Sequence, residues 1–182
     1  MEQHYFSDEE WTLLRQAPTQ AAIAVILADK TDPVSFLKET QAAAQILLEE
    51  QARVVDEASD LVSAVLEAMG AAETSNQEHP GLPNATPVDL KQLDILIKIR
   101  AFENASKGRE QAIAHVDKAS EILASKVTIV QTQEFNKWLV NIAHRVASAV
   151  KEKGFLGIGG EWESDDERSV IKKLEKALEF KD

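Results

Sequence analysis

Apolar residues recur at steps of three and four along most of the chain, which is the spacing of one face of an α-helix. The clearest run follows Thr132, where a helix is predicted to begin, and ends near Gly154. Its apolar positions are Phe135, Trp138, Leu139, Ile142, Ala143, Val146 and Val150. A last helix is predicted after Ser164-Asp-Asp-Glu167, which has the spacing of a capping box. Its inward-facing residues are expected to be Val170, Ile171, Leu174, Ala177 and Leu178.

The N-terminal part of the chain predicts three helix starts. Ser7-Asp-Glu-Glu10 is a capping box, so a helix is expected to follow it. Pro18 is predicted to begin a second helix that runs to about Asp29. Asp32 is predicted to cap a third helix, with Pro33 at its first position, where a missing N–H group is no loss.

The stretch from Val34 to Met69 contains neither proline nor glycine. Apolar residues and one glutamine form a heptad-like seam along it: Ala44, Leu47, Gln51, Val54, Ala58, Leu61 and Val65. The seam is compatible with one helix of about 36 residues, roughly 54 Å long. Two helices that are broken near Gln51 are the alternative.

Residues 71–86 contain proline, glycine and small polar side chains, and are predicted to be a flexible linker. Thr86-Pro-Val-Asp89 then predicts a new helix start, and helix is expected to about Lys126, either continuous or interrupted near residues 104–108. Two long antiparallel elements joined by the linker would account for the similar lengths of the two stretches. The β-branched run Val127–Val130 is interpreted as a loop or a helix end, because no second strand is available to pair with it.

The composition supports an all-α fold and restricts the partners. Alanine is abundant and aromatic residues make up only 5% of the 182 residues, so a single helical bundle of six to eight helices over residues 1–182 is expected. A formal charge of −11 disfavours nucleic acid and anionic membranes as partners. Cysteine is absent, which excludes disulfides and thiolate sites. No signal segment is visible, and a cytoplasmic location is the default.

Residues 151–164 contain four of the seven glycines, with large apolar residues between them. They lack the pattern of a phosphate-binding loop, and the acidic residues that follow would repel phosphate. A packed connection between two helices is therefore expected. If its apolar side chains are exposed instead, Phe155, Ile158 and Trp162 would form a partner-binding surface.

Metal and catalytic chemistry find little support in the residue pattern. The acidic residues around Glu161 and Glu163 offer oxygen ligands for a divalent cation, but the EF-hand pattern is absent. Neither His115 nor His144 has the partners of a zinc or di-iron motif. No catalytic residue is therefore assigned, and His144 is expected to be a partly buried, hydrogen-bonded side chain.

Two families resemble parts of the chain. The N-terminal part resembles one end of a family of uncharacterised bacterial helical proteins, at Trp11, Leu14, Ala17, Pro18, Ala28, Asp29, Lys38 and Glu39. The C-terminal part resembles the other end of that family, at Phe135–Ala147, Lys151–Gly160, Ser164 and Glu167. That family implies an all-helical cytosolic domain without an established activity. Residues 146–178, and less closely 24–44, also resemble the tellurite-resistance TerB-like fold. This second resemblance implies carboxylate metal sites, with Asp29 and Asp32 in the first loop.

The leading expectation is a soluble, non-enzymatic helical binding or interaction protein without a cofactor, with self-association through its amphipathic stretches as one form of it. The alternative is a carboxylate-based, divalent-metal-binding protein of stress-response, TerB-like type, using Asp29, Asp32, Glu161 and Glu163. An enzyme built around His115 and His144 is the least favoured class.

Overall fold

The computed structural model describes residues 5–28, 33–53, 60–75, 84–152 and 165–179. These residues form seven helices and no strand, so the prediction of an all-α fold with six to eight helices is confirmed for the described part of the chain. The helices are α1 (Asp8–Ile26), α2 (Pro33–Gln51), α3 (Asp60–Ser75), α4 (Pro87–Arg100), α5 (Ala105–Lys126), α6 (Ile129–Glu152) and α7 (Asp165–Leu178).

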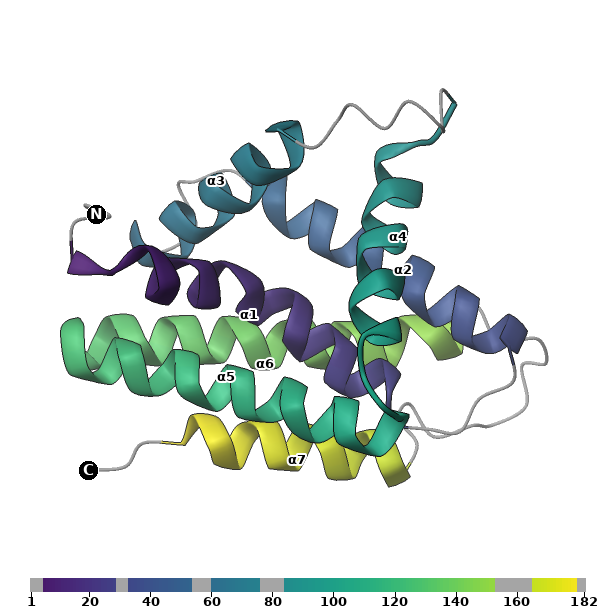
Figure 1. Ribbon diagram of the computed structural model, residues 1–182. Coiled ribbons are helices and arrows are strands. Elements are labelled where there is room, and N and C mark those ends of the chain that lie inside the picture. Colours follow the sequence, from purple (N-terminus) through teal and green to yellow (C-terminus); the bar gives the residue numbers. More distant parts are fainter. Residues whose placement is uncertain (1–4, 29–32, 54–59, 76–83, 153–164, 180–182) are drawn as a thin grey trace.

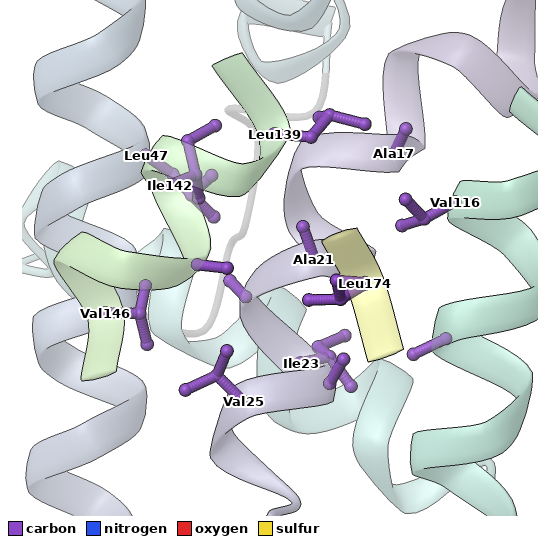
Figure 2. Packing of buried hydrophobic residues seen from close by; sticks show 14 of the residues in the cluster. Ala17, Ala21, Ile23, Val25, Leu47, Val116, Leu139, Ile142, Val146 and Leu174 are labelled. Atoms are coloured by element: carbon purple, nitrogen blue, oxygen red, sulfur yellow. The ribbon is translucent and has the colours of Figure 1, made fainter. Parts of the chain in front are cut away.

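Helix α1 is the central element of the fold. It packs mainly against α5 and α6 and also contacts α2, α3, α4 and α7 (Figure 1). Its alanines let neighbouring helices approach closely, because interaxial distance depends on side-chain size. Figure 2 shows Ala17, Ala21 and Ile23 of α1 among core side chains from other helices, such as Val116 of α5 and Leu174 of α7.

The prediction that Pro18 begins a separate helix is wrong, because α1 is continuous and contains Pro18 in its interior. A proline inside a helix costs about 3 kcal/mol. That cost is offset by buried side chains on both sides of Pro18, Leu14 and Ala17 before it and Ala21–Ile26 after it, since each fully buried aliphatic side chain contributes roughly 1.5–3 kcal/mol. The predicted start is confirmed: Ser7 and Glu10 form the capping box in both directions.

The Val34–Met69 stretch follows the two-helix alternative, since α2 ends at Gln51 and α3 begins at Asp60. Helix α3 continues through Gly70 to Ser75, so the connection to α4 begins later than residue 71. The start of α4 is as predicted: Thr86 caps it, Asp89 completes the capping box, and Pro87 occupies the first turn.

The second long stretch is interrupted between α4 and α5, where the Asn104 side chain accepts a hydrogen bond from the Lys107 N–H and caps α5. The two long stretches therefore do not form one antiparallel hairpin. Helix α2 packs on α4, whereas α5 packs on α1 and α7. Each break lets the two halves of a stretch bury their apolar faces against different neighbours.

Helix α6 begins at Ile129, three positions before the predicted Thr132. The side chains of Thr128 and Gln131 exchange hydrogen bonds with each other's backbone N–H groups, at 3.3 and 3.1 Å, in the geometry of a capping box. Val127 ends α5 and the run forms no strand, as interpreted, but Ile129 and Val130 form the first turn of α6 rather than a loop or a helix end.

The apolar stripes predicted for α6 and α7 lie in the core. On α6 the buried members are Phe135, Trp138, Leu139, Ile142, Ala143 and Val146; on α7 they are Val170, Ile171, Leu174 and Leu178. Within the described ranges, no helix combines the length and the apolarity that a bilayer crossing requires.

Candidate interaction surface

The site residues predicted from the sequence lie outside the described residues. This holds for the partner-binding set Phe155, Ile158 and Trp162, and for the metal set Asp29, Asp32, Glu161 and Glu163. Both sets stay predictions. Within the described part of the chain, no three histidine or acidic side chains come together as a metal site would require.

The two helical histidines have partners on different helices. His115 of α5 is half-buried, and its Nε2 lies 2.9 Å from the carbonyl oxygen of Leu13 in α1. Burial lowers the pKa of His115, the hydrogen bond with Leu13 partly opposes this lowering, and the charge of Lys118 adds a smaller lowering. His144 of α6 is partly exposed, and its Nε2 lies 3.5 Å from a carboxylate oxygen of Glu175 in α7. These contacts give each histidine a role in joining two helices.

A buried carboxylate ties α2 to α6. Glu50 is only 4% exposed and accepts a hydrogen bond of 2.8 Å from the Trp138 indole N–H. Arg53 donates to the same oxygen at 3.1 Å, and Arg145 pairs with both Glu49 and Glu50. Donors on several sides satisfy this carboxylate, which is the arrangement a buried charge requires. The cluster holds the two helices together, with Glu50 buried at its centre and Glu49, Arg53 and Arg145 reaching solvent at its edge.

Helix α4 lies at the periphery of the fold, across α2 (Figure 1). Its inner face contains Lys91 and Ile95, which are buried. Val88 and Ile99 lie on the same side of the helix and pack against the core. Gln92 fixes α4 on α2, because its side-chain NH2 donates to the Leu37 carbonyl at 2.9 Å and to the Thr40 hydroxyl at 2.8 Å.

The opposite side of α4 is also aliphatic. At about 100° per residue, Leu90, Leu93 and Ile97 fall within about 60° of one another and roughly opposite the buried face. Ile97 is 60% exposed, and Leu90 and Leu93 are half-buried. Among the described residues, the partly buried side chains that pack against the core include Val88 and Ile99 but not Leu90 or Leu93. We call Leu90, Leu93 and Ile97 the outer stripe of α4.

The two ends of α4 carry charges of opposite sign, while Lys91 is buried on the inner face. Asp89 lies in the first turn, whereas Lys98 and Arg100 lie in the last turn. Lys98 also pairs with Asp94 in the middle of the helix. The first turns of α2 lie beside α4 and add two exposed aliphatic side chains, since Val34 is 62% and Leu37 is 50% exposed. This part of the surface is therefore more apolar than a chain with a net charge of −11 would lead one to expect.

The sequence also indicates this surface, although a search for one apolar face of a helix does not find it. Residues 87–100 have aliphatic side chains on two opposite sides of the helix: Val88, Ile95 and Ile99 on one, and Leu90, Leu93 and Ile97 on the other. A helix that packs on a core through a single face needs only one such apolar side. Here the fold covers only one of these faces.

No family model, curated protein or solved structure matches this chain. The resemblances to the bacterial helical family and to the TerB-like fold therefore stay predictions.

Proposed function

We propose that this protein is a non-enzymatic helical interaction protein that associates through the outer stripe of α4 with the same stripe of a second copy. The aliphatic side chains on the face of α4 that points away from the core, exposed at Ile97 and half-buried at Leu90 and Leu93, carry this proposal. Their spacing of three and then four residues is that of a seam between two packed helices. Exposed aliphatic side chains gathered on one face are typical of interaction sites.

The charges on α4 favour an antiparallel arrangement of the two copies. A two-fold axis near Leu93 places Leu90 of one copy opposite Ile97 of the other. The acidic first turn with Asp89 then lies beside the basic last turn with Lys98 and Arg100. A parallel pair would place like charges together. Charge complementarity of this kind fixes register and suppresses the alternative arrangement.

Sedimentation equilibrium over a wide range of protein concentrations tests the proposal. The natural chain is expected to pass from monomer to dimer, and the double variant Leu93→Asp, Ile97→Asp is expected to remain monomeric, because charges would be buried in the seam. Ile129→Asp is the matched control, since Ile129 is 68% exposed on the first turn of α6 and is expected to leave dimerisation unchanged. A natural chain that stays monomeric throughout, or a double variant that still dimerises, would refute the proposal.

The absence of cysteine makes the orientation testable by cross-linking. An equal mixture of Leu90→Cys and Ile97→Cys variants is expected to form mainly the mixed disulfide on mild oxidation, because these positions face each other in the antiparallel pair. Intact mass separates the mixed product from the two homodimers. Predominant Leu90→Cys homodimers would instead establish a parallel pair.

A further inference from the structure

The solvent-facing side of α7 is basic, although the whole chain has a net charge of −11. Arg168, Lys172 and Lys176 are spaced four residues apart and therefore lie along one side of the helix over roughly 12 Å. With Asp165, Ser169 and Lys173 they line a surface hollow of about 440 Å³. We call Arg168, Lys172, Lys173 and Lys176 the basic face of α7.

The fold holds this face outward. Val170, Ile171 and Leu174 are buried in the core, so α7 cannot rotate about its axis without exposing them. Acidic residues border this face: Asp165 lines the same hollow and pairs with Arg168, and Glu175 lies beside His144 of α6. Asp166 and the buried Glu167 occupy the first turn, where the helix dipole favours them.

The lysines of the basic face have their charges available. In the described part of the chain, Lys172, Lys173 and Lys176 have no carboxylate partner within 4 Å, whereas Arg168 pairs with Asp165 at 3.1 Å. Three ammonium groups without a carboxylate partner along one helix attract a negatively charged partner. The buried face of α7 fixes the backbone that carries these lysines.

We propose that the basic face of α7 binds an acidic helix of a partner protein, with glutamate or aspartate side chains at four-residue spacing beside Arg168, Lys172 and Lys176. Charged pairs of this kind flank the contacts between packed helices. This site is on a different helix from the outer stripe of α4 and does not depend on it.

Other anionic partners fit the geometry less well. A basic amphipathic helix binds a membrane by inserting its apolar face, and the apolar face of α7 is buried in the core. A phosphate group needs donors that converge on one point, whereas these four are spread along the helix. A long nucleic acid would extend beyond the basic face onto a surface that is acidic overall.

Fluorescence anisotropy with a labelled peptide tests the proposal on the full chain. The probe is an alanine-based helical peptide with glutamate at every fourth position. It is expected to bind the natural protein and to bind the Lys172→Glu, Lys176→Glu variant about tenfold more weakly. The matched control is Lys118→Glu, Lys137→Glu, which changes the net charge equally at exposed lysines of α5 and α6 and is expected to bind like the natural chain.

The proposal would be overturned if the two double variants bound the peptide with equal affinity. It would also be overturned if the natural protein bound a peptide with glutamine in place of glutamate equally well. Tighter binding to single-stranded DNA or to phosphatidylserine vesicles than to the peptide would overturn it as well. Circular dichroism shows whether each variant is folded. Sedimentation of the Lys172→Glu, Lys176→Glu variant is expected to match that of the natural chain, which separates this site from association through α4.

Discussion

At the scale of single residues, His115 couples folding to pH. Its ring is half-buried between α5 and α1, and burial lowers its pKa below the ordinary value of 6.5. As pH falls below 6.5, the unfolded chain takes up a proton at this position before the folded chain does. The contribution to stability is therefore fully present above pH 6.5 and is lost as pH falls towards the folded-state pKa.

We expect the free energy of unfolding to decrease between about pH 7.5 and pH 5.5, and His115→Gln to make this decrease smaller. Glutamine can still donate a hydrogen bond to the Leu13 carbonyl but does not titrate. Urea unfolding at several pH values measures the difference between the two chains. A pH dependence that is unchanged in the variant would show that other groups cause it.

Glu50 shows why individual roles are hard to read from sequence. It is one of 31 acidic residues, and nothing in its neighbourhood along the chain marks it as buried. Its donors Trp138 and Arg145 come from α6, almost a hundred positions later. The core role predicted for Trp138 holds, but its hydrogen bond depends on how α2 and α6 cross.

At the scale of helices, two glycines inside helices have opposite surroundings. A Cβ atom on Gly108, in the first turn of α5, would lie 2.7 Å from the Phe102 ring and 2.9 Å from a methyl group of Leu27. A Cβ atom on Gly70, in α3, would meet nothing within 4 Å. Gly108 therefore permits the close approach of α5 to the end of α1, where Arg109 also donates to the Leu27 and Ala28 carbonyls.

We expect Gly108→Ala to destabilise the protein by about 1–3 kcal/mol, because overpacking outweighs the gain in helix propensity. Gly70→Ala is the matched control and is expected to stabilise it by about 0.5–1 kcal/mol. Thermal and urea unfolding give both values. A stabilising Gly108→Ala substitution would show that Phe102 and Leu27 move aside without loss.

At the scale of the whole molecule, net charge opposes association between copies. Two chains of charge −11 repel each other, and salt screens this repulsion, with a Debye length of about 10 Å at 0.1 M. Added salt does not weaken the aliphatic contacts that α4 would make. Binding of an acidic helix to α7, in contrast, depends on attraction between opposite charges.

We expect the dimer to become tighter as sodium chloride rises from about 20 to 300 mM, while the acidic peptide binds α7 more weakly. Sedimentation and anisotropy measured on the same salt series check both directions. A dimer that dissociates as salt rises would mean that charge pairs rather than the outer stripe hold the two copies together.

Local signals predicted much of the fold. The capping boxes at Ser7 and Thr86 and the stripes of α6 and α7 depend on residues within a few turns of one another, so the chain encodes them directly. The start of α6 was missed because glutamine at residue 131 completes a capping box that the β-branched neighbours obscure. The outer stripe of α4 was missed because its meaning depends on which face α2 covers.

The sequence by itself determined the helical class, most helix starts and the residues of the strongest apolar faces, because spacing and capping act over short distances. Only the tertiary structure decided that Pro18 lies inside one helix, since the burial of both halves of α1 outweighs the missing hydrogen bond. It also decided which aliphatic and basic faces point outward. Exposure depends on contacts between distant segments. One face of α4 or α7 is exposed to solvent because the opposite face packs against the core.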